Sequence, residues 1–226
     1  MALDHDGVDD QVDHGDIAAI DGATALSGMI WVFIDTLEVE GAFFWKGNRA
    51  GNTASLFFGM DSATNSTLLW ASAYSTIDGA RAAGQVATGA WAHFAFAYDG
   101  SGVGNANRLF LYKDGVGLTE TFVGTVPASL TSNTDAFQVG VGEIAATPTV
   151  FTDGKFAHLR LWSAVLTAGE IAQEMNSYRP VRTANLVLWS PYDDGTSARD
   201  YSGSGNHGTV TGALQFQGPP VSYGGI

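Results

Sequence analysis

The chain has 226 residues, no cysteine and a formal net charge of −13, from 10 Lys and Arg against 23 Asp and Glu. The lack of cysteine excludes disulfide bonds and thiolate metal sites. The shortage of basic residues argues against a nucleic-acid or anionic-membrane surface, because both need clustered Lys and Arg. Glycine (29 residues) and aromatic residues (12%) are abundant, a composition typical of many short strands joined by tight turns.

The first ten residues, MALDHDGVDD, contain neither a basic segment nor an apolar core, so we expect no secretory signal peptide. Apolar runs elsewhere are too short to span a bilayer, so we expect no membrane association. These features predict synthesis in the cytoplasm, followed by incorporation into a virus particle or release from the cell.

Apolar or alternating segments bounded by turn residues predict a series of short strands. They lie near residues 29–35, 42–46, 55–60, 68–74, 91–98, 108–113, 118–123, 137–141, 155–162 and 186–189. Asp114 and Gly115, between two of these segments, predict a tight hairpin turn because both residue types tolerate positive φ.

One helix is predicted, near 168–176. Thr167 is a suitable N-cap, Glu170 is its capping-box partner, and Ile171 and Met175 share one face. No internal repeat or linker is visible, so residues 1–226 are expected to form a single domain. The fold class predicted is an all-β, two-sheet antiparallel sandwich, or jelly roll, with this one short helix.

Four segments together resemble the laminin-G-like jelly roll of the concanavalin-A-like lectin/glucanase superfamily. They are LDHDGVDDQV (3–12), WAHFA with LFLYKDG (91–95 and 109–115), FAHLRLW with LTAGEI (156–162 and 166–171), and DYSGSGNHG (200–208). The last segment commonly precedes the first in that family, whereas here it closes the chain. The resemblance therefore implies a permuted sandwich whose first and last strands lie side by side, within one chain or by exchange between subunits.

Seven aspartates crowd the first 21 residues, but their spacing does not fit an EF-hand, which needs Gly at its sixth position. If the two ends of the chain meet, Asp6, Asp9, Asp200 and Asn206 converge, and the resemblance implies structural calcium there. The alternative is that the acidic residues are solvated and prevent a strand edge from pairing wrongly.

Aromatic faces can stack on sugar rings, so several aromatic residues are candidates for a carbohydrate platform. The candidates are Trp45, Trp70, Tyr74, Trp189, Tyr192 and Tyr201. We predict carbohydrate binding by Trp70 and Tyr74, with Asn105 and Asn107 from a neighbouring loop, and we assign Trp31, Trp91 and Trp162 to the core. A further candidate for an ion or ligand site is the loop rim at one end of the sandwich, with Asp61, Asn65, Asp99, Asp135 and Glu143. Most such residues only form turns.

Glu38 and Glu40 are the one candidate pair for glycoside hydrolysis, since alternate residues of a strand share a face. No third carboxylate accompanies them, and solvated loop acids are the simpler interpretation. His93 and His158 fall within apolar strands and are interpreted as buried, hydrogen-bonded histidines.

The sequence thus favours a non-catalytic binding module that recognises carbohydrate or a protein partner and is stabilised by calcium. A structural or assembly protein, such as a decoration or appendage component of a virus particle or another homo-oligomer, is the first alternative. A glycoside hydrolase or lyase of the same fold is the second.

Overall fold

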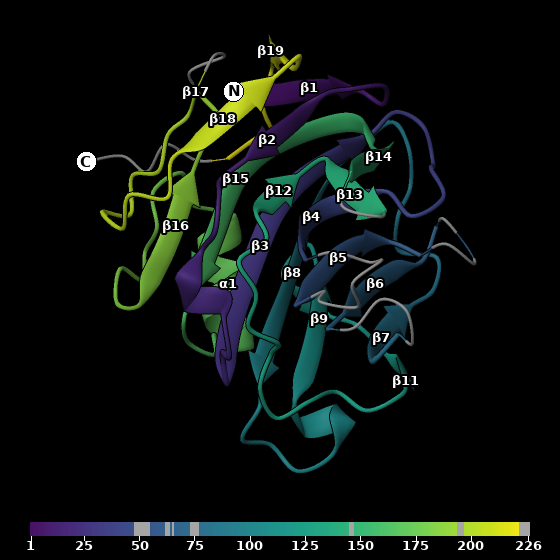
Figure 1. Ribbon diagram of the computed structural model, residues 1–226, viewed down its shortest axis with the longest axis vertical. Helices are drawn as coiled ribbons and strands as arrows, with labels where there is room; N and C mark the ends of the chain where they lie inside the picture. The colour runs from purple at the N-terminus through teal and green to yellow at the C-terminus, as the bar shows by residue number, and fades with distance from the viewer. Residues whose placement is uncertain are drawn as a thin grey trace.

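The computed structural model describes residues 1–47, 55–61, 64, 66–72, 77–144, 147–193 and 197–221, with the backbone alone for 143–144 and 147–149. Within these residues the chain forms two stacked antiparallel sheets and one α-helix, so the predicted fold class is confirmed. Figure 1 shows the two sheets with the helix α1 to one side of them.

The first sheet contains, in spatial order, β10 (Val116–Gly117), β9 (Leu109–Lys113), β8 (Trp91–Asp99), β3 (Ala25–Ile34), β15 (Asp153–Trp162), β1 (Ala2–Asp6) and β19 (Leu214–Phe216), with β16 (Leu186–Ser190) also paired to β15. The second contains β11 (Thr121–Val123), β7 (Gly79–Ala82), β6 (Leu68–Ala71), β5 (Leu56–Met60), β4 (Ala42–Lys46), β12 (Phe137–Val139), β2 (Gln11–Asp13), β18 (Gly208–Thr211) and β17 (Ser197–Ala198). A separate hairpin joins β13 (Val141–Ile144) to β14 (Thr147–Phe151), and two 3-10 turns, η1 (Ala18–Ile20) and η2 (Asn105–Asn107), lie in loops.

The main core fills the space between the two sheets. Inward-facing residues of β3, such as Ile30 and Val32, alternate with residues on the outer face of the sheet, as the period of a strand requires. Aromatic rings dominate this core: Phe58 packs on Phe96 with ring centroids 5.4 Å apart, and both rings are buried. Burial of this apolar surface, worth about 25 cal/mol per Å², is the main force that holds the sheets together.

The two ends of the chain complete both sheets. β19 pairs with β1, with Leu3 opposite Gln215, and β18 pairs with β2, with Val12 opposite Val210. The purple first strands and the yellow last strands therefore lie side by side in Figure 1. The expected meeting of the first and last strands is confirmed, and it occurs within one chain.

The helix α1 (Ala168–Met175) begins at Thr167 with the predicted capping box: Glu170 N–H donates to Thr167 Oγ1, and Thr167 N–H donates to Glu170 Oε2. It covers the outer face of the first sheet, where Ile171 packs with Trp162 and Met29 in a second apolar cluster. The described helices include none long and apolar enough to cross a membrane.

The predicted turn at Asp114 and Gly115 is confirmed, with φ of 50° and 76° and Lys113 paired to Val116. Of the three tryptophans assigned to the core, Trp162 is fully buried. The core assignment is wrong for Trp31 and Trp91, since both are half-buried. They occupy the outward positions of β3 and β8, where Trp31 meets His93 and Trp91 meets Phe33 across the strand pair.

Gly140 offers a test of close packing under the first strand. Its φ is 76°, and an added Cβ would lie 2.2 Å from His5 Nδ1. Gly84 has a similar φ of 69° but has nothing within 4 Å of that position. We expect Gly84→Ala to lower the free energy of unfolding by about 1 kcal/mol through backbone strain alone. Gly140→Ala should cost about 2 kcal/mol more because it also overpacks the core. Urea unfolding of both variants measures this difference, and equal losses would contradict it.

Candidate functional site

An open cleft of about 350 Å³ lies beside β16. It is lined by Tyr178, Arg179, Trp189, Pro191, Asp193 and Tyr201. These residues come from three parts of the chain: the segment after α1, β16 with the residues that follow it, and the loop after β17. Three aromatic side chains and two charged groups therefore meet at one place.

A bulge in β15 sets the floor of this region. Ala157 pairs with Trp31 and Arg160 with Met29, so β15 has one residue more than β3 over this stretch. His158 takes up the extra residue with φ of 53°. As a result Phe156 and Leu159 both face the main core, while Arg160 points to the outer face beneath α1. A bulge that redirects a side chain in this way is common beside functional sites.

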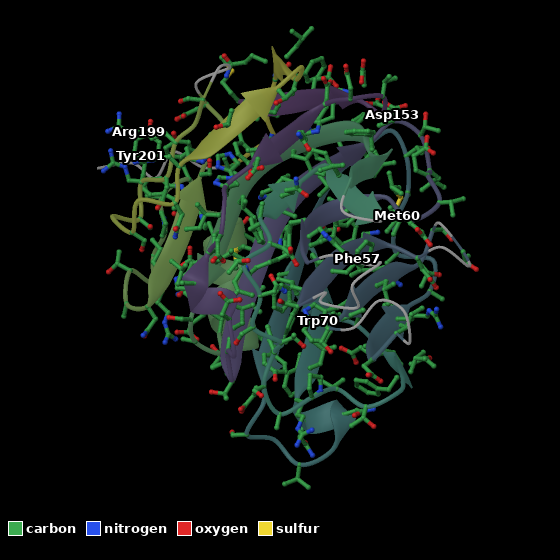
Figure 2. All side chains as sticks on the ribbon, in the orientation of Figure 1. Phe57, Met60, Trp70, Asp153, Arg199 and Tyr201 are labelled. Atoms are coloured by element: carbon green, nitrogen blue, oxygen red, sulfur yellow. The ribbon has the colours of Figure 1, made fainter. Side chains whose placement is uncertain are left out.

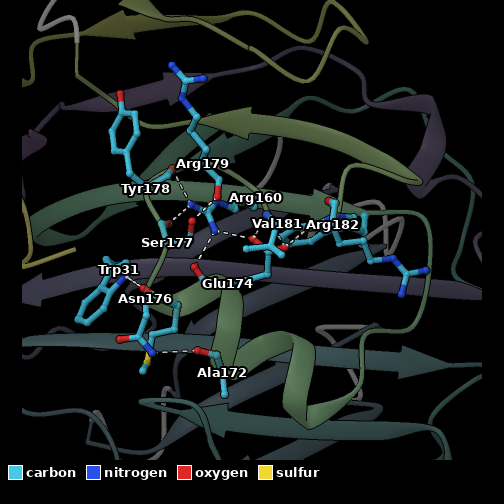
Figure 3. A network of polar contacts seen from close by, with 12 residues as sticks. Trp31, Arg160, Ala172, Glu174, Asn176, Ser177, Tyr178, Arg179, Val181 and Arg182 are labelled. Carbon is cyan, nitrogen blue, oxygen red and sulfur yellow. Dashed lines mark hydrogen bonds and ion pairs between the residues drawn. The ribbon is translucent and has the colours of Figure 1, made fainter. Parts of the chain in front are cut away.

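Arg160 fixes the segment that carries Tyr178 and Arg179. Its side chain is 1% exposed, and its guanidinium donates to the Glu174 carboxylate at 2.7 Å and to the backbone carbonyls of Glu174, Ser177 and Tyr178. Figure 3 shows this network and shows the Tyr178 and Arg179 side chains extending away from α1. Because each buried N–H needs an acceptor, the chain after α1 must wrap around the guanidinium.

Glu174 closes the other side of the same network. It is buried, and besides Arg160 its carboxylate accepts hydrogen bonds from the backbone N–H groups of Val181 and Arg182 (Figure 3). Burial lowers the pKa of Arg160 to about 10, although Glu174 opposes this shift, so the guanidinium is charged at neutral pH. The pair thus anchors both ends of the 177–182 segment.

His158 supports Tyr178 from below. The two rings meet edge to face with centroids 5.4 Å apart, and His158 is 3% exposed. Burial, with a further contribution from the Arg160 charge, lowers the pKa of His158 to about 3. The histidine is therefore neutral near pH 7 and acts as a packing surface rather than as a base.

Asp200 holds the opposite wall. Its Oδ1 accepts from the backbone N–H groups of Trp189 and Ser202 at 3.0 and 2.8 Å, and its Oδ2 accepts from Ser202 Oγ and Asn206 N–H at 2.9 and 3.0 Å. Tyr201 N–H in turn donates to the Trp189 carbonyl at 2.8 Å. The DYSGSGN segment is therefore fastened to β16 by the Asp200 carboxylate, by this backbone bond and by the Asn206 amide, which donates to the Val187 carbonyl at 2.8 Å. These contacts set Tyr201 beside Trp189.

The rings of the cleft form a continuous wall. Trp189 lies 5.6 Å from Tyr201 and 6.2 Å from Tyr178 between ring centroids. Tyr201 is 44% exposed, and the Arg199 guanidinium lies 5.2 Å from its ring centroid. Figure 2 shows Arg199 and Tyr201 together at the outer edge of the molecule. The Tyr178 hydroxyl donates to the Asp193 carboxylate, so the wall also carries a fixed polar group.

The predicted carbohydrate residues lie elsewhere. Trp70 is a correction: it is fully buried in the main core and stacked on Tyr98 at 5.6 Å, so it has no face for a sugar (Figure 2). Tyr74 lies outside the described residues. The Asn107 amide donates to the Val103 carbonyl of its own loop, and the Asn105 amide donates to the Gly124 carbonyl of the segment after β11. Carbohydrate binding by these two asparagines stays a prediction.

Of the wider set of aromatic candidates, Trp45 and Tyr192 are also buried. Trp189 and Tyr201 are the two that reach the cleft. Sequence reasoning missed Tyr178, Arg179, Asp193 and Arg199 as neighbours of these rings. The available signal was the Tyr178-Arg179-Pro180 stretch directly after a capped helix, because binding residues are often placed on such loops.

The predicted metal ligands fall into two places rather than one. Asp6 and Asp9 lie together, with Asp10, and the ligand atoms of the three carboxylates are all within 4.8 Å of one another. Asp200 and Asn206 lie in the loop beside β16, where Asn206 O meets His14 Nδ1 at 2.9 Å. The strand β2 separates the two pairs by roughly 13 Å, at 3.3 Å per residue from Asp10 to His14. Both oxygens of Asp200 are already taken by the contacts described above.

The three carboxylates of the acidic cluster Asp6/Asp9/Asp10 border a cavity of about 540 Å³. Asp6 sits opposite Asp153 in the β1–β15 pair, so a fourth carboxylate lies close by. Asp10 accepts a hydrogen bond from Asp6 N–H at 2.8 Å, yet its pKa is raised by burial and by its acidic neighbours. Lys155 is the basic group of this cavity, and it is already paired with Asp35 and Asp4.

Two of the remaining rim candidates have local partners. Asp61 pairs with Arg81 at 2.6 Å, and Asp99 accepts from Ser101 N–H, as expected for turn residues. Asn65 lies outside the described residues. Glu38 and Glu40 lie in the connection between β3 and β4, and Glu40 has φ of 68°, so the two carboxylates do not share a strand face.

A model for the concanavalin A-like lectin/glucanases superfamily, of the laminin-G type, matches residues 6–172. The chain belongs to this superfamily. The match ends before the cleft loops at 177–182 and 199–206, so the site lies mainly in the part of the chain that the family model does not cover. No curated protein sequence matches the chain.

Solved structures of this superfamily's fold agree with the architecture. A Bacteroides ovatus protein to which carbohydrate binding has been ascribed matches with a TM-score of 0.72 at 16% identity, over 99% of this chain and 61% of its own. A pentraxin from Limulus polyphemus matches with a TM-score of 0.55 at 11% identity, over 83% of this chain and 87% of its own. The CBM40 module of a Ruminococcus gnavus sialidase, solved with bound α2,3-sialyllactose, matches with a TM-score of 0.56 at 10% identity, over 76% of this chain and 97% of its own. At these identities the likeness concerns the fold, and the chain spans about three fifths of the Bacteroides protein.

The Arg160–Glu174 pair can be tested with a matched substitution. Glu174→Gln leaves a buried guanidinium without its counter-charge, so we expect the free energy of unfolding to fall by about 3–5 kcal/mol. Glu170→Gln on the same helix alters an exposed pair with Arg182, whose side chains are 31% and 28% exposed, and retains capping-box chemistry. It should cost less than about 1 kcal/mol. Denaturant unfolding compares the two, and similar losses would contradict the assigned role of the buried pair.

Proposed function

We propose that this chain is a non-catalytic carbohydrate-binding module whose site is the Tyr178–Trp189–Tyr201 cleft. The observation that carries the proposal is the continuous aromatic wall, open to solvent and bordered by charged groups. The C–H faces of a pyranose pack on such rings, and polar groups at the rim then fix the orientation of its hydroxyls.

The polar groups suit this use. The Asp193 carboxylate, which accepts from the Tyr178 hydroxyl, has acceptor capacity left for a sugar hydroxyl, because two oxygens offer about four lone-pair sites. The buried Trp189 Nε1 has no hydrogen-bond partner within the described part of the chain. The backbone of both walls is fixed by buried carboxylate contacts, so the ligand does not have to order the site when it binds.

Relatives support carbohydrate as the ligand class. The Bacteroides ovatus protein has carbohydrate binding ascribed to it, and the Ruminococcus gnavus module was solved with a bound oligosaccharide. A glycosidase needs two carboxylates across the scissile bond. Asp193 is the one carboxylate among the described residues that line the cleft, and binding without hydrolysis is therefore the better account.

The proposal is tested by replacing the aromatic wall. We expect Trp189→Ala and Tyr201→Ala each to weaken binding of the best ligand from a glycan array by at least about tenfold, since truncating a central aromatic anchor costs more than about 1.4 kcal/mol. Trp91→Ala is the matched control, because Trp91 lines a different cleft of about 380 Å³ beside Phe216. Isothermal titration calorimetry measures each affinity. An array without any bound glycan, or a loss confined to Trp91→Ala, would reject the proposed site.

We propose further that the acidic cluster Asp6/Asp9/Asp10 holds a structural calcium ion. Calcium takes six to eight oxygen ligands, and three carboxylates within 4.8 Å supply its usual negative donors. Burial raises the pKa of Asp10 most, and the neighbouring carboxylates of Asp6, Asp9 and Asp4 add to the rise, a repulsion that a bound cation would relieve. The ion would tie β1 to the start of β2 at the edge where the chain ends meet.

Calcium should therefore stabilise the fold. At 100 times the dissociation constant, an ion that binds only the native state adds about 2.7 kcal/mol, which raises the Tm of a chain of this size by several degrees. We expect this rise on adding calcium to chelator-treated protein, and we expect Asp9→Asn to abolish it. Asp9 is exposed, so its substitution without calcium should leave the Tm nearly unchanged. Identical melting of the wild type with calcium and with chelator would favour the solvated-edge interpretation.

A further inference from the structure

The basic residues of this acidic chain are almost all paired. Of the ten Lys and Arg residues, Arg49 lies outside the described part, and seven of the other nine donate to a carboxylate or a backbone carbonyl. Within the described chain the two that have no hydrogen bond or ion pair are Arg179 and Arg199. Arg179 lines the proposed carbohydrate cleft, and Arg199 lies over the ring of Tyr201, which lines it.

The two arginines belong to different walls of the cleft. Arg179 lines it directly from the segment held by Arg160, and its own carbonyl accepts from Ser177 Oγ at 2.6 Å. Arg199 lies over the ring of Tyr201, on the wall held by Asp200. The residues next to both arginines are thus held by Arg160 or lie in the hydrogen bonds of Asp200, whereas each guanidinium keeps all of its donors for an outside acceptor.

The electrostatic setting makes this unusual. With a net charge of −13 the protein repels anions in general, so two unpaired guanidinium groups at one cleft form a local exception. Among the described residues, Asp193 is the acidic group that lines the cleft, and it already accepts a hydrogen bond from the Tyr178 hydroxyl. A guanidinium presents paired N–H donors that match the two oxygens of a carboxylate or a sulfate ester.

We propose that the cleft selects saccharides bearing an anionic group, a carboxylate or a sulfate ester, which Arg179 and Arg199 bind while the sugar ring packs on Trp189 and Tyr201. The inference rests on the proposed carbohydrate-binding function and names the ligand class within it. It predicts that ligand charge, and not only ring stacking, determines affinity.

A set of ligands that share one neutral core provides the test. Lactose, 3′-sialyllactose and 3′-sulfolactose differ in the anionic group, and trigalacturonate against galactotriose repeats the comparison on a second backbone. We expect at least one acidic member to bind at least tenfold more tightly than its neutral counterpart. Arg179→Gln and Arg199→Gln, and above all the double variant, should reduce that ratio to within about threefold.

Arg182→Gln is the matched control, since Arg182 is nearby in sequence but is paired with Glu170, and it should keep the full ratio. Tighter binding of the carboxylated member alone, or of the sulfated member alone, supports the inference and identifies the group. If neutral and acidic ligands bind with equal affinity and Trp189→Ala abolishes that binding, the inference is overturned and the proposed function stands. A preference for acidic ligands that survives the double arginine variant also overturns it. A failure to bind any glycan on an array overturns both.

Discussion

The burial of the Arg160 guanidinium beneath α1 is the constraint on which the cleft depends. Removing a cation from water costs several kcal/mol unless its donors are all met by well-placed acceptors. Here the two terminal nitrogens of the guanidinium donate to the Glu174 carboxylate and three backbone carbonyls, while Nε has no partner among the described residues. Two of those carbonyls belong to the segment that carries Tyr178 and Arg179. The geometry of one wall of the cleft is therefore a consequence of satisfying one buried charge.

The other wall depends on a carboxylate in the same way. Asp200 receives four hydrogen bonds, and these fasten the loop before β18 to β16. That loop reaches β16 only because β18 and β19 pair with the first strands of the chain. The closure of the sandwich by its two ends thus leads directly to the placement of Tyr201 and Arg199, residues that close the sequence yet complete a site begun at Tyr178.

Much of the fold could be predicted from local patterns. The strand predicted at 42–46 matches β4, and the helix predicted from Thr167 and Glu170 has its capping box, because alternation and caps depend on neighbouring residues only. The short strands β17 and β19 have no such signal and exist through pairing with distant partners. The bulge at His158 is equally hidden, since the sequence does not indicate which residue of a strand will be left without a partner.

The site was harder to predict because exposure and ligation are properties of the assembled structure. Trp70 was predicted to face solvent, yet both faces of β6 are covered and all four of its residues are buried. Asp200 was predicted to bind metal, a role that its residue type permits, but backbone N–H groups compete for the same oxygens and occupy them here. In both cases the residue type was chemically reasonable and the long-range neighbours decided its role.

The distribution of charge separates two kinds of surface on this molecule. The carboxylates of the acidic cluster and of Asp153 gather at the edge formed by β1 and β15, where Lys155 is already engaged by Asp4 and Asp35. The cleft beside β16 instead has Arg179 in its lining and Arg199 over the ring of Tyr201. Exposed charges more than about 8 Å apart are largely screened from each other at physiological salt. The electrostatic potential in the cleft is therefore set mainly by the residues of the cleft and not by the acidic edge. A cation at one site and an anionic sugar at the other are therefore compatible on a single small sandwich.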